Sequence, residues 1–124
     1  MTTNKKEMEL RFIHEQLQKI QAHAEKLDSQ VEELSGTVEA LKDLPEKGKD
    51  ILVPIANGIF LKAKSEDNKE LVVNVGSKVT VKKTTQSTVT MLEKQIKDME
   101  QYRQQLVEQF ETLAQHAMKL EQGD

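Results

Sequence analysis

The fold is decided where a helical hydrophobic period gives way to short β-rich runs, in the stretch ILVPIANGIFLKAK, residues 51–64. Asn57-Gly58 divides this stretch and suits a type I′ hairpin turn, because both central residues of that turn need positive φ. Pro54 cannot donate a hydrogen bond to a neighbouring strand, so the first strand is expected at a sheet edge or a bulge. We predict a β-hairpin with strands over 51–56 and 59–64.

A second hairpin is predicted further along the chain, with strands over 71–75 and 79–83. Gly76-Ser77 between these strands suits a type II′ turn, and residues 66–69 form the polar loop that precedes them. Four short strands without a second layer are marginally stable in water. We therefore expect the hairpins of several chains to close a barrel or a sandwich through one set of residues: Ile59, Phe60, Leu61, Leu71, Val73, Val75, Val79 and Val81.

Residues 1–44, on the N-terminal side of the hairpins, carry an unbroken heptad pattern, which predicts a coiled-coil helix. Asn4 and Glu7 have the spacing of a capping box, and Leu44-Pro45 with Gly48 should end the helix. The two apolar rows are Leu10, Leu17, Ala24, Val31 and Val38, and Ile13, Ile20, Leu27, Leu34 and Leu41.

Residues 85–122 return to the same pattern and predict a second helix. Candidates for its N-cap are Thr84, Thr85, Ser87 and Thr88. Its rows are Val89, Ile96, Arg103, Phe110 and Ala117, and Leu92, Met99, Leu106, Leu113 and Leu120.

The two rows match each other if the helices run antiparallel. Pairing Leu41 with Val89 brings every seam residue level with a seam residue of the other helix, as far as Leu10 with Leu120. Arg103 then lies level with Leu27 and must extend its guanidinium to solvent. A shift by one heptad also leaves the seam apolar, so the register stays open. The predicted fold is mainly α with a small β part: a long antiparallel coiled-coil hairpin, joined by two β-hairpins that oligomerise, in a single domain over residues 1–124.

The end of this coiled coil where the termini meet carries apolar side chains outside the seam. Exposed Met and Phe there could hold varied apolar surfaces weakly, although single exposed apolar residues are usually without function. The candidate residues for such contacts, including seam residues that fraying would expose, are Met8, Leu10, Phe12, Ile13, Met118 and Leu120.

Composition excludes several classes of protein. The 124 residues are 31% charged and 3% aromatic, and they contain no cysteine, which excludes disulfides, Cys-ligated metals and thiol catalysis. The net charge of −3 argues against nucleic-acid binding, and neither a membrane span nor a signal peptide is apparent. A cytoplasmic protein without nucleic-acid or membrane partners is expected.

The sequence offers no motif of enzyme chemistry. It has no Gly-rich phosphate loop, no nucleophile elbow and no HExxH, so we expect no enzyme, no cofactor and no metal. His14 and His116 would lie level but on opposite flanks of the seam, where solvated side chains are a better interpretation than a zinc site.

The middle of the chain resembles the prefoldin family, in particular the archaeal α subunit. The resemblance rests on residues 53–63, VPIANGIFLKA, and on residues 73–77, VNVGS, between two coiled-coil arms. The chain departs from the family pattern at Lys78, where Gly is common, and at Lys82, where an acidic residue is common.

The resemblance implies a chaperone without ATP dependence. It implies a hexamer of two α with four prefoldin β subunits around a β-barrel, whose arm ends hold unfolded polypeptides and pass them to a group II chaperonin. The positions that it implies for client binding, matched by their location at the arm ends, are Met8, Phe12, Ile13, Leu113, Met118 and Leu120. Two alternatives are a coiled-coil adaptor that binds one folded partner, and a homo-oligomeric or filamentous relative that needs no β subunit.

Overall fold

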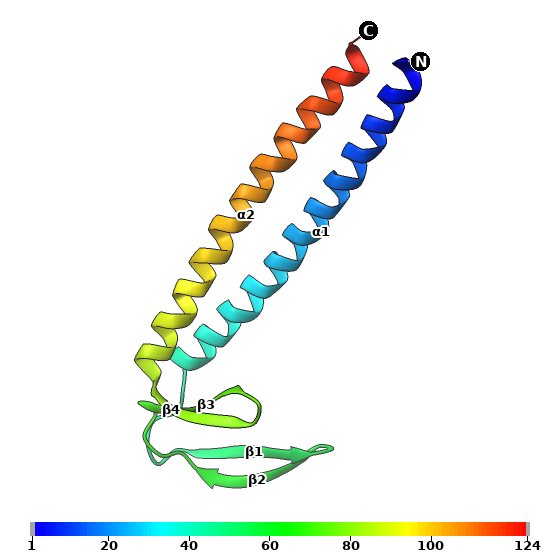
Figure 1. Cartoon of the computed structure of the whole chain (residues 1–124). Helices are drawn as coiled ribbons and strands as arrows, with labels where there is room; N and C mark the ends of the chain where they lie inside the picture. The colour runs from blue at the N-terminus through cyan, green and yellow to red at the C-terminus, as the bar shows by residue number, and fades with distance from the viewer. Residues whose placement is uncertain (1, 124) are drawn as a thin grey trace. The chain divides into compact units, whose positions relative to one another are not determined.

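The computed structural model describes residues 2–123 as two long helices with two β-hairpins between them (Figure 1). The elements, in chain order, are α1 (Thr2–Lys42), β1 (Asp50–Ala56), β2 (Ile59–Lys64), β3 (Glu70–Gly76), β4 (Val79–Thr84) and α2 (Thr85–Gln122). The chain divides into two compact units, and the first pairs the part of α1 up to Leu34 with the part of α2 from Gln95 onward. The second unit, residues 35–94, holds the hairpins and the adjoining ends of both helices.

The ends of α1 follow one sequence prediction and contradict another. The helix ends at Lys42, just before Leu44-Pro45, as predicted, because proline disfavours the helical conformation of the residue that precedes it. The predicted capping box is wrong: α1 begins at Thr2, so Asn4 lies inside the helix.

In the first unit, α1 and α2 run antiparallel beside each other, and both termini lie at the same end (Figure 1). We call this pair of helical segments the arm. Among the described residues, every buried apolar side chain belongs to one of the predicted heptad rows. These residues are Ile13, Leu27, Val38, Val89, Leu92, Leu106 and Ala117. Burial of one stripe per helix is what a two-stranded coiled coil requires.

Contacts between the helices agree with the pairing predicted from Leu41 and Val89. In the first unit, the Arg103 guanidinium donates from Nε to Asp28 Oδ1, one residue beyond Leu27. The rings of His23 and Tyr102 meet edge to face, with centroids 5.1 Å apart. The sequence predicted only that the Arg103 guanidinium extends to solvent, whereas in the structure it pairs with a carboxylate.

The start of α2 is capped as the Thr/Ser cluster predicted. Thr84 precedes the first helical residue, and its Oγ1 accepts a hydrogen bond of 3.0 Å from the backbone N–H of Ser87. Ser87 Oγ donates back to the Thr84 carbonyl at 3.1 Å, and buried Thr88 donates to the same carbonyl at 2.9 Å. The first of these bonds satisfies a backbone N–H that a helix start leaves unpaired.

The two hairpins have the same pattern of strand pairing, with equivalent residues 20 positions apart in the sequence. Asp50 pairs with Lys64 in the first hairpin as Glu70 pairs with Thr84 in the second. The register shifts between Pro54 and Ala56, and the equivalent shift in the second hairpin falls between Asn74 and Gly76. The bulge predicted at Pro54 is therefore confirmed.

The turns of the hairpins are also alike, which corrects one prediction. Asn57 and Gly58 have φ of 50° and 78°, as a type I′ turn requires. In the second hairpin, Ser77 and Lys78 are the residues between the strands, with φ of 49° and 64°. The turn is centred on Ser77-Lys78 and has the same positive φ pair, so the predicted type II′ turn at Gly76-Ser77 is wrong.

The link from α1 to β1 is fastened to the end of β2. Gly48 N–H donates to the Ser65 carbonyl at 2.8 Å, and Ser65 N–H donates to the Lys49 carbonyl at 2.9 Å. Ser65 Oγ donates to the Glu46 carbonyl. The hairpin therefore begins from a fixed point within the second unit.

Candidate functional site

The hairpins expose more large apolar side chains than any other part of the described chain. Large apolar side chains rarely stay in water on a small sheet unless another surface covers them. The exposed set is Leu52, Val53, Ile55, Ile59, Phe60, Leu61, Val72, Val75 and Val79. Four of these residues, Leu52, Val53, Ile55 and Val72, were missed from the sequence, because the predicted set took no residue of β1 and only alternate positions of β3.

The remaining residues of the predicted oligomerisation set are half-buried. Leu71, Val73 and Val81 lie on one face of the second hairpin, where Val73 pairs with Val81. The equivalent face of the first hairpin holds Ile51 and Ala63, which pair with each other and are also half-buried. Each hairpin therefore has one partly covered face, while Leu52, Phe60 and Val72 on the opposite faces are exposed.

Each hairpin is a two-stranded sheet, so one edge of every strand is unpaired within the described residues. An unpaired edge presents backbone N–H and C=O groups that a further strand can bind. Apolar faces and free edges together make these hairpins suited to association with other strands.

A second apolar cluster lies at the end of the arm. Met8, Phe12 and Met118 are 70%, 61% and 56% exposed, and we call these three residues the arm-end surface. Met8 and Phe12 are four residues apart and so share one side of α1. Of the other predicted binding residues, Leu10, Leu113 and Leu120 are half-buried in the seam. Ile13 is buried, with 4% exposure.

The register of the arm sets the height of each helix's contribution. Ile13 and Ala117 are both buried in the same layer, which places Phe12 and Met118 level with each other on the outside of the arm. Lys6 Nζ donates a 2.8 Å hydrogen bond to the Gly123 carbonyl and so joins the helices beyond this layer. Phe and Met side chains in water offer weak, adaptable apolar contacts rather than a shaped pocket.

The arm also holds a shallow apolar groove of about 410 Å³. It opens where Ala24 is too small to fill the layer that it shares with Leu106. Its other walls are Ile20, Gln21, Val107, Phe110 and Glu111.

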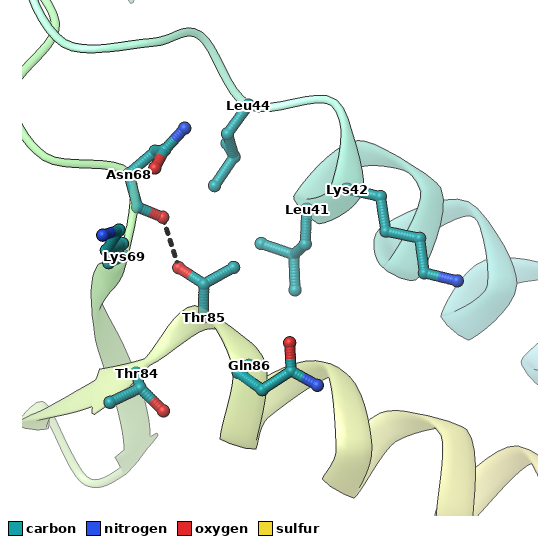
Figure 2. Close-up of a pocket in the computed structure, with 8 residues that line it drawn as sticks. All are labelled: Leu41, Lys42, Leu44, Asn68, Lys69, Thr84, Thr85 and Gln86. Atoms are coloured by element: carbon teal, nitrogen blue, oxygen red, sulfur yellow. Dashed lines mark hydrogen bonds between the residues drawn. The ribbon is translucent and has the colours of Figure 1, made fainter.

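A hollow of about 450 Å³ lies in the second unit, between the end of α1, the start of α2 and the loop before β3 (Figure 2). Thr85 Oγ1 donates a 2.6 Å hydrogen bond to the Asn68 carbonyl at its wall, and Leu41 and Leu44 supply apolar contact. Lys42 and Lys69 line it without an acidic partner in the lining. This arrangement holds the loop against α2 and contains no nucleophile–base pair.

The described residues contain neither a cluster of metal ligands nor a helix suited to span a membrane. No three His, Asp or Glu side chains among residues 2–123 gather as metal ligands would. Within that part of the chain, no helix has the length and apolar character of a membrane span.

Comparison with known proteins gives a consistent result. The family model described as "Prefoldin subunit" matches residues 13–123. Prefoldin subunit alpha of Methanococcus aeolicus is 29% identical over 73 residues, which cover 59% of this chain and 51% of that protein. Prefoldin subunit alpha 1 of Thermococcus kodakarensis is 44% identical over 54 residues, or 43% of this chain and 37% of that protein. The chain thus spans about half the length of the first of these relatives and a smaller share of the length of the second.

A solved structure shares the fold. A chain of the filamentous PFD from Methanocaldococcus jannaschii, determined by cryo-EM, superposes with a TM-score of 0.75 at 23% identity. The match covers 91% of this chain and 95% of that one. Two long helices with two small hairpins between them are therefore common to both.

Proposed function

Because this chain belongs to the prefoldin family of chaperones, we propose that it is an alpha-type subunit of a holdase that works without ATP. In this proposal it captures unfolded polypeptides at the arm ends and delivers them to a group II chaperonin in the cytoplasm. The relatives named prefoldin subunit alpha support the alpha-type assignment.

The observation that carries this proposal is the arm-end surface. Met8, Phe12 and Met118 are each more than half exposed, although the seam beside them is well packed. Unfolded chains differ in sequence but all expose apolar side chains, so flexible Met and Phe contacts suit them. Weak contacts on several arms of one assembly would add up through avidity.

The proposed assembly joins two such subunits with four prefoldin β subunits. The apolar faces and free edges of the hairpins support a barrel built from several chains. A homo-oligomer or filament of this chain alone is the alternative arrangement. Native mass measurement of the chain alone, and then with a β subunit, separates the two: a hexamer that forms only in the mixture supports the proposal.

The client-binding proposal is tested by the double variant Phe12→Ser and Met118→Ser. We expect the assembly to form normally and the suppression of client aggregation to fall several-fold. The matched control is Phe12→Leu with Met118→Leu, which keeps apolar side chains at both sites and should retain most of the activity. Full suppression by the Ser variant would show that clients bind elsewhere.

A panel of unrelated denatured proteins separates a holdase from an adaptor. A holdase slows the aggregation of several of them, because apolar contact is unspecific. An adaptor for one folded partner slows none, and that result would refute the proposal.

A further inference from the structure

We propose that the Arg103–Asp28 ion pair selects the register of the arm, and that it thereby positions the arm-end surface. The apolar seam cannot make this choice. If either helix moves by one heptad, Ile, Leu, Val and Met still face one another along the seam, with at most the end layers lost. The choice must come from residues whose partners change with the register.

Arg103 is such a residue, because it is the one charged member of the seam rows of α2. In the observed register it faces Leu27, and its guanidinium bonds to Asp28. A shift of one heptad in one direction would place Gln21 at the position of Asp28, and a shift in the other direction would place Ser35 there. Neither side chain is an anion, so only the observed register pairs this charge.

Contacts at two other levels agree with this register. Glu93 lies 4.0 Å from Lys42. The first shift would place Ser35 opposite Glu93 instead, and the second would leave Glu93 beyond the end of α1. Tyr102 contacts His23, and either shift would replace His23 with a glutamine, Gln16 or Gln30. These contacts lie on the flanks of the seam, whereas Arg103 occupies the seam itself. A polar group in an apolar seam is a known means of fixing register at some cost in stability.

The register decides what surrounds the arm-end surface. In the observed register Phe12 and Met118 are level. The first shift would bring Phe12 level with Glu111 and Met118 level with Lys5, and the second would bring Met118 level with Lys19. Either shift therefore puts a charged side chain, in place of an apolar one, at the height of Met118 along the arm. This consequence for client binding rests on the proposed function, but the choice of register does not.

Distance measurement between two spin labels tests the inference on the full chain in its assembly. The chain lacks cysteine, so Ser29→Cys with Gln115→Cys places one label on the exposed face of each helix without removing a native thiol. Dilution with unlabelled chain isolates pairs within one subunit. The first shift lengthens the axial separation of the labels by about 10 Å, and the second shortens it by about 10 Å. The two shifts and the native register are thus distinguishable.

We expect one distance population in the native background. In the variant Arg103→Leu with Asp28→Gln, a displaced population should rise about fivefold, as expected for loss of a half-exposed pair. The helix content, followed by circular dichroism, should be retained, because leucine suits the seam. Glu108→Gln, which removes an acid from the outer face of the arm, should leave the single population. A single undisplaced population in the Arg103 variant would overturn the inference.

Moving the acid gives a directional test. Gln21→Asp with Asp28→Gln offers Arg103 its partner one heptad away, so the population with the longer distance should grow. No change, or growth of the shorter distance, would refute the role of the pair. Since no client is present, failure here leaves the holdase proposal untouched, and failure of the client assay leaves this one untouched.

Discussion

Asn57 and Ser77 occupy the same position in the two hairpins, with φ of 50° and 49°. Each begins a two-residue turn whose second residue is also in the left-handed region, and each follows a bulge at the same place in the register. The residues that follow them differ. Gly58 adopts positive φ without strain, whereas Lys78 has a side chain that disfavours it.

Replacing Lys78 with glycine should stabilise the second hairpin. The left-handed conformation costs a residue with a side chain about 1–2 kcal/mol, and the greater freedom of glycine in the unfolded chain offsets part of this gain. We expect a net increase of about 0.5–1 kcal/mol in the free energy of unfolding, measured in urea. The reciprocal variant Gly58→Lys should lower it, although no atom lies within 4 Å of the position of an added Cβ. Equal stability of both variants would contradict this account.

Removing the cap of α2 should weaken the junction between β4 and the helix. Thr84→Ala deletes the oxygen that accepts from Ser87 N–H, so we expect a loss of about 1 kcal/mol. Thr84→Ser keeps that oxygen and should lose much less. Thr90→Ala, at an exposed position inside the same helix, is the control and should be neutral or slightly stabilising. Equal effects of the two alanine variants at 84 and 90 would exclude a capping role.

The arm should be most sensitive at Leu106, which is 4% exposed. Its partner in the same layer is Ala24, so truncation of Leu106 leaves a layer with two small side chains. Leu106→Ala should cost about 2–4 kcal/mol, measured by denaturant unfolding. Gln105→Ala, at the exposed neighbouring position, should change the free energy of unfolding by less than about 0.5 kcal/mol.

Assembly should depend on the outer face of the first hairpin. Leu52 and Phe60 share this face and are 61% and 55% exposed. The variant Leu52→Ser with Phe60→Ser removes apolar area worth about 1.5–3 kcal/mol per side chain when buried, so the oligomer should dissociate at concentrations where the native one persists. Sedimentation gives the mass, and circular dichroism should show intact helices.

The arm-end variant Phe12→Ser with Met118→Ser is the counterpart of this experiment, because it alters exposed apolar side chains outside the hairpins. It should sediment like the native protein. If both variants assemble normally, the exposed face of the first hairpin is not an interface.

The helices and strands could be predicted because their signals are local. Heptad spacing, Asn57-Gly58 and the threonines before α2 each act within a few residues, and the structure confirms them. The capping box predicted at Asn4 was wrong, since the helix continues past Asn4 to Thr2. The turn at Ser77-Lys78 was missed because lysine has no preference for positive φ; the pairing of the strands imposes it there.

The candidate sites were less predictable for a different reason. Exposure depends on what the other elements cover, so Leu52 and Ile55 were not distinguished from residues that pack within the hairpin. In the arm the heptad rows do separate such neighbours, because Ile13 lies in a row and is buried, whereas Phe12 lies outside the rows and is exposed. The register itself could not be predicted from apolar spacing, because that spacing repeats every seven residues. The acid that pairs with Arg103 does not repeat, so it distinguishes one register from the next.

The duplicated hairpin changes the number of neighbours that one chain can join. A single hairpin offers two unpaired strand edges, which suffices for a link in a ring, whereas the described part of this chain holds two such sheets and so four edges. It can therefore act as a branch point rather than a link. The size of an assembly then depends on which of the four edges pair with another strand, and on which kind of chain supplies that strand.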